Sequence, residues 1–341
     1  MGDRPSTTSA RCHLLRKPDG LTSEGAETPP AKDVQTLHAD GSLCLKRYVC
    51  SAKRGIAHEE DSAARQQIVF VLGGVFVRRG PRGTDLGAPN QVLFFDKDAP
   101  YQVDHPDARG DDSLIVELPD EDWQAWVRAR HPSHSDEGLR GVPWLSALCP
   151  PASFLGAWRL VAALRAPRDP AGVRQAVYDL LDSVGTPASR QTHRGTRDLV
   201  EAVRIELARR AGGSTRLTEV ARAFGVSSYY LCHAFRAQVG MPPHAYLRRL
   251  RVREAVRRLD AGLNQDLTSL ALELGFFDHS HFTRAFRSEF GVPPSSWRRM
   301  ARSVSELGMV PPGVAPPSPD PRPRSSLRRS RRPISSGRSA E

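Results

Sequence analysis

The sequence has few cysteines and no long apolar run. Its five cysteines are scattered and form no pair of CxxC motifs, so neither a disulfide framework nor a four-cysteine zinc site is supported; they are Cys12, Cys44, Cys50, Cys149 and Cys232. No stretch approaches the roughly 18 consecutive apolar residues of a membrane span. The first 20 residues lack the apolar core of a signal peptide, so we expect a cytoplasmic protein and no membrane partner.

Lysine is also scarce, since the five lysines all precede residue 98 and arginine supplies the remaining cations. The formal net charge of +11 is unevenly distributed. Residues 197–302 carry 18 Arg against 10 Asp and Glu, a net +8, and residues 303–341 carry 7 against 3, a net +4. By subtraction, residues 1–196 are near −1. A basic C-terminal half favours an anionic partner such as nucleic acid, although a solvated cationic surface would give the same charge.

Composition divides the chain into five parts. Residues 1–36 are rich in Ser, Thr, Pro and Gly and are expected to be a disordered leader. Residues 37–184 are expected to form a domain of short strands followed by helices, and 185–196 a linker. Residues 197–302 are predicted to be helical and basic, and 303–341 form a Pro, Ser and Arg-rich tail that is expected to be disordered.

Short β-rich runs separated by turn residues occupy 37–118 and predict a small barrel or sandwich. The runs are GSLCLKRYVC, QQIVFVLGGVFVRRG, NQVLFFDK, PYQVDH and DSLIVELP. Cys44 and Cys50 fall on one strand or on neighbouring strands, as small core residues or as part of a redox or metal sensor. Acidic residues at the start and basic residues at the end then predict a helix in PDEDWQAWVRARH. Apolar residues at helical spacing predict two more, in ASFLGAWRLVAALRA and DPAGVRQAVYDLLDSV. The second and third helices either mediate dimerisation or the passing of a signal to the C-terminal half, or they cover the core of the barrel.

The C-terminal half contains an internal repeat. Leu217, Thr218, Ala221 and Gly225 match Leu267, Thr268, Ala271 and Gly275 at an offset of 50 residues. After one inserted residue, the matches continue at an offset of 51, as in Phe235 with Phe286 and Arg236 with Arg287. Each copy has the parts of a helix-turn-helix: a short apolar-sided helix, a turn glycine, a capping Ser227 or Asp278 and a second helix.

The second helix of each copy leaves polar side chains on its outward face, and these are the candidate DNA-binding residues. They are Ser228, Tyr229, Cys232, His233 and Arg236 in the first copy, and His279, Ser280, Thr283, Arg284 and Arg287 in the second. Such helices can enter a major groove and read base edges. A single helix from about His244 to Asp260, roughly 25 Å long, is expected to hold the copies on successive groove segments of duplex DNA. A plain helical bundle would leave these polar faces unexplained.

Residues 197–302 resemble the DNA-binding domain of AraC/XylS-type transcriptional regulators. The resemblance rests on LTEVARAFGVSSYYLCHAFR, the long linking helix and LALELGFFDHSHFTRAFRSEFGVPPSSWR. It implies base-reading roles for Tyr229, Cys232, His233, His279, Ser280, Thr283 and Arg284, and Arg284 is the strongest candidate because arginine is the commonest reader of guanine. A cysteine and a histidine at 232 and 233 replace the longer polar residues often found there.

The stretch GGVFVRRG…NQVLFFDKDAPYQVDHP resembles the cupin-like sensor domain that precedes such DNA-binding regions. The resemblance implies that residues 37–184 form a sensor and dimerisation domain. The expected fold class is therefore α+β, with a cupin-like β-barrel followed by helices, and an all-α domain with two helix-turn-helix motifs. A barrel could hold an unidentified small-molecule effector.

No metal site, cofactor or catalytic residue is expected in this chain. The His-x-His, Glu and His set of metal-binding cupins is absent, and His58 and His105 are isolated in the sequence. Two enzyme classes are alternatives, a cupin oxygenase and a DNA-repair methyl acceptor, but the sequence lacks the metal ligands of both. We therefore predict a transcriptional regulator, with RNA polymerase and a second copy of the chain as further partners.

Overall fold

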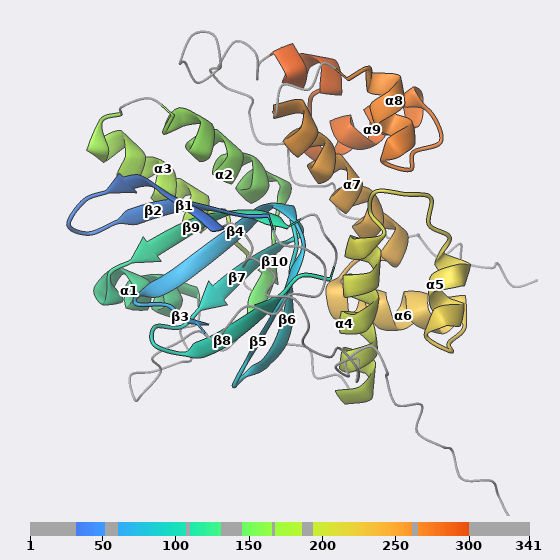
Figure 1. Ribbon diagram of the computed structural model, residues 1–341, viewed down its shortest axis with the longest axis horizontal. Helices are drawn as coiled ribbons and strands as arrows, with labels where there is room; N and C mark the ends of the chain where they lie inside the picture. Colours follow the sequence, from blue (N-terminus) through green and yellow to red (C-terminus); the bar gives the residue numbers. More distant parts are fainter. Residues whose placement is uncertain are drawn as a thin grey trace, which may run out of the picture.

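The computed structural model describes residues 32–51, 61–106, 110–130, 145–165, 168–185, 194–260 and 265–299. The predicted leader up to residue 31 and the predicted tail at 303–341 lie outside these ranges. Figure 1 shows strands in the N-terminal half and helices in the C-terminal half, lying side by side. None of the described helices is both long enough and apolar enough to cross a membrane.

The described strands form two antiparallel sheets. Their bounds are β1 Lys32–Ala39, β2 Cys44–Cys50, β3 Asp61–Ser62, β4 Gln66–Gly74, β5 Phe76–Gly80, β6 Gly83–Gly87, β7 Gln91–Phe95, β8 Pro100–Asp104, β9 Asp111–Leu118 and β10 Ser146–Leu148. Within the described ranges, one sheet has the order β1-β2-β9-β4-β7-β10 and the other β3-β8-β5-β6. Every run predicted from the sequence contains a strand. The first strand begins at Lys32, before the predicted boundary at residue 37.

The larger sheet packs on both faces because side chains alternate along a strand. Ile68 and Phe70 of β4 point into a core shared with helices. Val69 and Val71 of the same strand point the other way, into a core shared with β5 and β8 of the smaller sheet. The two sheets therefore face each other, and helices cover the outer face of the larger one (Figure 1).

The helices follow the predicted order. Their bounds are α1 Asp120–Arg130, α2 Pro151–Ala163, α3 Pro170–Asp182, α4 Arg194–Arg209, α5 Leu217–Ala223, α6 Ser228–Val239, α7 Pro243–Asp260, α8 Leu267–Glu273 and α9 His279–Phe290. The three helices predicted before residue 185 correspond to α1, α2 and α3. Helix α4 begins inside the segment expected to be a linker. The fold is thus mixed, with a sheet-rich N-terminal region and a helical C-terminal region, as the sequence predicts.

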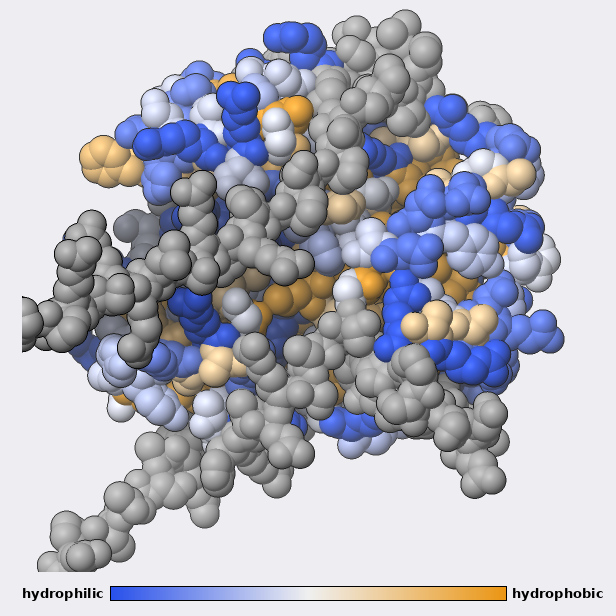
Figure 2. Space-filling view, turned by 180° about the vertical axis from the view of Figure 1, so that it is seen from behind, coloured by the Kyte–Doolittle hydropathy of each residue, from blue (hydrophilic) through white to orange (hydrophobic). Residues whose placement is uncertain are grey.

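Helix α7 lies between two helix pairs, α5 with α6 and α8 with α9, and also packs on the sheets. Val252 and Val256 of α7 belong to the same core as Phe70 of β4 and Phe286 of α9. A second core joins Leu250 of α7 to residues of α4, α5, α6 and β6. The two halves of the chain therefore share apolar cores. Figure 2 agrees, since apolar side chains gather toward the middle of the face it shows and hydrophilic ones cover the periphery.

Candidate DNA-binding surface

The first helix pair folds around a tight turn. Val220 of α5 and Phe235 of α6 are fully buried in one core, which fixes the second helix against the first. Gly225 lies in the turn with φ of 67°, a conformation that glycine adopts without steric cost. The Ser227 hydroxyl oxygen accepts a 3.1 Å hydrogen bond from the Tyr230 N–H and so caps α6. These were the turn and cap residues expected from the sequence.

The outward face of α6 carries the residues predicted from the first repeat. Tyr229 is 75% exposed, and its ring lies 4.6 Å from that of His233, measured between centroids. His233 and Arg236 are exposed, whereas Ser228 and Cys232 are half-buried. The exposed part of α6 is therefore an aromatic pair next to a cation, and no acidic residue occurs in this helix.

The second helix pair repeats the same construction. Phe282 and Phe286 of α9 are fully buried, and Gly275 lies in the turn with φ of 74°. The Asp278 carboxylate accepts a 2.6 Å hydrogen bond from the His281 N–H at the start of α9. The side chain at 278 is thus the cap that the sequence predicted.

The outward face of α9 carries the predicted residues of the second repeat. His279, Ser280, Arg284 and Arg287 are exposed, and Thr283 is half-buried. The Thr283 hydroxyl lies 3.4 Å from Nε2 of His279, which brings two hydrogen-bonding groups together one helical turn apart. All ten predicted residues therefore lie on α6 or α9.

Glu289, the acidic residue of α9, is directed away from this face. Its carboxylate accepts hydrogen bonds from Arg249 at 3.1 Å and from Arg253 at 2.8 Å, both on α7. The inward direction of Glu289 leaves Arg284 and Arg287 without a carboxylate on the same face. The outward face of α9 is therefore positively charged, and such a face attracts a polyanion.

Two exposed aromatic residues near α6 and α9 are not among the predicted residues. Phe277 is 86% exposed immediately before α9, and Tyr230 is 45% exposed beside Tyr229. The Tyr230 hydroxyl lies 3.4 Å from the Thr196 hydroxyl of α4, so Tyr230 is turned toward α4. Consecutive helical residues point about 100° apart, so the pair of tyrosines indicated that one of them would face a neighbouring helix.

Comparison with known proteins identifies the family. Residues 220–300 match a family model described as a helix-turn-helix domain. An AraC-like transcription regulator of Streptomyces lividans is 28% identical over 290 residues, covering 84% of this chain and 77% of that protein. The HTH-type transcriptional activator AarP of Providencia stuartii is 31% identical over 99 residues, covering 29% of this chain and 73% of AarP. The chain belongs to the AraC/XylS-type transcriptional regulators.

A solved structure is similar to part of this AraC/XylS-type regulator. The C-terminal domain of AraT, a response regulator from Geobacillus stearothermophilus, is 24% identical, covers 30% of this chain and 84% of its own, and has a TM-score of 0.29. A TM-score this low supports no conclusion about fold. The relatives named above are transcriptional regulators, in agreement with the expectation that the chain is not an enzyme.

The N-terminal half of the regulator contains a cavity of about 80 Å³ between its two sheets. Polar groups of Tyr48, Gln67 and Ser113 line it together with the rings of Phe95 and Tyr101. Typical small-molecule pockets measure about 300–1,000 Å³. The cavity therefore fits an ion or a very small ligand.

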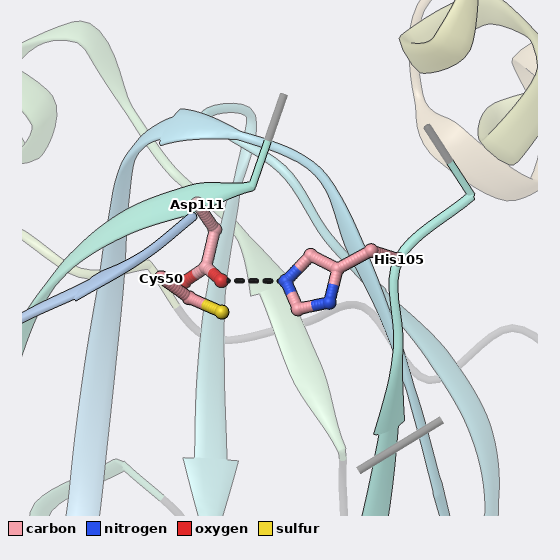
Figure 3. Close-up of side chains that lie close together, drawn as sticks. All are labelled: Cys50, His105 and Asp111. Atoms are coloured by element: carbon pink, nitrogen blue, oxygen red, sulfur yellow. Dashed lines mark hydrogen bonds and ion pairs between the residues drawn. The ribbon is translucent and has the colours of Figure 1, made fainter. Parts of the chain in front are cut away.

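His105 is not isolated, contrary to the sequence interpretation. Its Nε2 lies 2.8 Å from Oδ1 of Asp111, and the Cys50 sulfur lies beside the pair (Figure 3). Burial opposes the charged imidazolium, but hydrogen bonds with Asp111 and Cys50 outweigh burial and raise the pKa of His105 to about 9. The grouping arises because Cys50 and Asp111 are cross-strand partners and His105 directly follows β8. His58 lies outside the described residues.

Proposed function

We propose that this regulator recognises a specific duplex sequence by placing α6 and α9 in successive major-groove segments. The observation that carries the proposal is the pair of outward faces, each polar or cationic and each free of carboxylates. Helix α7 has 18 residues, or about 27 Å at the usual rise, and spaces the two faces rigidly. Successive major-groove segments on one side of B-DNA lie roughly 34 Å apart.

Different roles are proposed for the two faces. On α9, Arg284 and Arg287 supply donors suited to guanine O6 and N7, and Thr283 and His279 supply further hydrogen-bonding groups. On α6, Tyr229 and His233 supply an aromatic surface suited to a thymine methyl group, and Arg236 supplies a phosphate contact. We therefore expect α9 to contribute more sequence discrimination than α6.

Selection from a random duplex library with the full chain tests this proposal. The expected product is one asymmetric site whose two conserved blocks lie about one helical turn apart. Footprinting on the selected duplex should protect both blocks on the same side. Enrichment of no motif at moderate salt, with binding equal to that of random competitor, would refute sequence recognition.

We further propose that the two facing sheets form a cupin-like sensor whose effector site is the cavity between them. The mix of apolar, aromatic and polar lining residues supports binding of a compact ligand. A thermal-shift screen of small metabolites and ions on the full chain tests this. Ser113→Leu, which fills the cavity, should abolish any shift, while the surface variant Gln175→Leu should preserve it.

A homodimer through α2 and α3 is the proposed assembly. A groove of about 730 Å³ between these helices is lined by apolar residues that include Leu160, Val173 and Ala176. Ala176→Arg should yield a monomer in sedimentation velocity, whereas Gln175→Arg, outside the groove, should sediment like the unaltered chain. A monomeric unaltered chain would refute the assembly. Contact with RNA polymerase stays a prediction, to be tested by transcription from the selected duplex.

A further inference from the structure

Three side chains with metal-binding atoms converge where the N-terminal sheets meet the helical half. Cys50 ends β2, His105 follows β8 and Asp111 begins β9, so each comes from a different segment. All three residues are buried, and their ligand atoms lie within 4.8 Å of one another. Figure 3 shows the thiol, the imidazole and the carboxylate directed toward one another.

The backbone is built to hold these side chains together. Gly74 and Gly110 have φ of 75° and 64°, conformations that favour glycine. A Cβ at Gly110 would overlap the carbonyl oxygen of Cys50, and a Cβ at Gly74 would overlap the carbonyl oxygen of Gly110. This close approach of three chain segments fixes Cys50 opposite Asp111.

The surrounding groups resemble the outer shell of a metal site. The Ser113 hydroxyl donates a 3.1 Å hydrogen bond to Oδ2 of Asp111 and so orients the carboxylate. Tyr48 lies two residues before Cys50 and therefore on the same face of β2. Asp111, Ser113 and Tyr48 also line the cavity of about 80 Å³ between the sheets, so one of the three donors borders on open space.

The donor set indicates which ion would bind. One sulfur, one nitrogen and one oxygen donor suit Zn²⁺, which is bound at about 2.0–2.3 Å by Cys, His and Asp in tetrahedral geometry. Ca²⁺ and Mg²⁺ prefer an all-oxygen set. A site with three protein ligands keeps its fourth position open.

The cluster also lies close to the helix that joins the two DNA-binding helix pairs. Asp111 pairs with Gly74, and the neighbouring Asp112 pairs with Gly73. The side chain of Arg257 of α7 lies against Gly73. The Val75 N–H donates to the Gly110 carbonyl at 3.2 Å, and Val75 packs in the core with α4–α7 residues. Asp111 is therefore connected to α7 through two adjacent sets of contacts.

We propose that Cys50, His105 and Asp111 form a Zn²⁺ site whose occupancy adjusts the packing of α7 and thereby DNA affinity. The part concerning DNA affinity rests on the proposed function, whereas metal binding does not. The proposal reverses the sequence expectation of no metal site. For Cys50, it favours the metal-sensor alternative over a small core residue.

Metal binding is tested on the full chain purified without a histidine tag. Mass spectrometry should find one equivalent of zinc in the unaltered chain and in Cys44→Ser, a control on the same strand, and none in Cys50→Ser. Cobalt should give a thiolate charge-transfer band that Cys50→Ser lacks. Ser113→Ala, which keeps the three ligands, should weaken zinc affinity about 10- to 100-fold. Equal zinc content in Cys50→Ser and Cys44→Ser would overturn the site.

Coupling is tested by measuring affinity for the selected duplex with Zn²⁺ and with a chelator. The affinity should change with zinc in the unaltered chain and in Cys44→Ser but not in Cys50→Ser. Stoichiometric zinc with no change in DNA affinity would overturn the sensing role. Zinc binding with no preference for any duplex in either state would instead refute the proposed DNA recognition and leave the metal site standing.

Discussion

Arg253 and Glu289 form an ion pair with 2.8 Å between Nη2 and Oε1, and the arginine side chain is completely buried. The same guanidinium donates hydrogen bonds to the carbonyl oxygens of Pro89 and Cys149 in the N-terminal half. It also lies 4.7 Å over the ring centre of Phe154. One side chain of α7 thus connects α9, α2 and two loops of the sheet region.

Arg253→Met is expected to destabilise the chain strongly. The substitution removes one of the two cations that contact Glu289, so that Arg249 alone is left. It also removes the hydrogen-bond donor of two buried carbonyl oxygens. Breaking a buried ion pair lowers the free energy of unfolding by about 3–5 kcal/mol. Urea unfolding followed by circular dichroism measures the effect. The control is Arg165→Met, which breaks the exposed Arg165–Asp260 pair and should cost less than about 1 kcal/mol. Similar losses in both variants would contradict the assigned role of Arg253.

Arg284→Ala is expected to weaken binding to the selected duplex by about 1–3 kcal/mol and to relax preference at one base position. The reason is the loss of a guanidinium that can donate two hydrogen bonds to one guanine from the exposed face of α9. Competition binding against duplexes altered at each position measures the loss. Arg174→Ala removes an equal charge from α3 and should leave base preference unchanged. An equal loss on every duplex sequence would show that Arg284 contacts phosphate only.

Asp278→Ala is expected to destabilise the second helix pair by about 1 kcal/mol, because the α9 cap is lost. Asp278→Asn keeps an oxygen acceptor for the His281 N–H and should recover most of this loss. Chemical denaturation of the three chains gives the comparison. If Asp278→Asn lowers the free energy of unfolding as much as Asp278→Ala does, the hydrogen bond at position 278 does not act as a cap.

Gly110→Ala is expected to cost more than Gly225→Ala, although both glycines have φ near 65°. A left-handed backbone costs an L residue about 1–2 kcal/mol at either position. Only at Gly110 would the new methyl group also overlap a backbone oxygen, since no atom lies within 4 Å of a Cβ at Gly225. Melting temperatures rank the two variants, and a reversed order would contradict the close approach of Gly110 to Cys50.

The pH dependence of stability should contain a contribution from Glu201 of α4, whose side chain is 16% exposed. Burial raises its pKa from 4.5 to about 7, against the opposing effect of Arg204, which also lies 3.8 Å from Asp85 of β6. A raised carboxyl pKa favours the protonated folded state. The contribution is therefore greatest below pH 4.5 and declines as the pH rises to 7, by at most about 1.4 kcal/mol per unit.

Glu201→Gln tests this assignment because glutamine cannot ionise. Its free energy of unfolding should fall less than that of the unaltered chain between pH 5 and pH 7, a window set by the two pKa values. Parallel curves for the two chains would show that Glu201 does not titrate in this range.

The elements that could be predicted from the sequence are those with strong local patterns. The repeat, its turn glycines and the caps at Ser227 and Asp278 are determined within a few residues, and the structure confirms them. Strands such as β4 have continuous apolar runs. By contrast, β6 contains two glycines, β10 has three residues and β3 has two, so none of them has a detectable period.

The features that could not be predicted depend on contacts between distant segments. The grouping of Cys50, His105 and Asp111 follows from strand register, which sequence spacing does not reveal. The sequence of α7 is rich in arginine, which is typical of a helix exposed to solvent. Arg253 is nevertheless buried, because its partners come from positions 89, 149 and 289.

The burial of α7 limits how this protein can be recombined with its relatives. The Asn90 side chain donates to the Tyr246 carbonyl, and the Tyr246 hydroxyl donates to Gln91, both at 3.1 Å. In a chimera joined within residues 185–196, Tyr246 and Arg253 would therefore contact loops that come from a different family member. Exchange of operator specificity between family members should succeed only when the loops around positions 89–91 and 149 are transplanted with the helices.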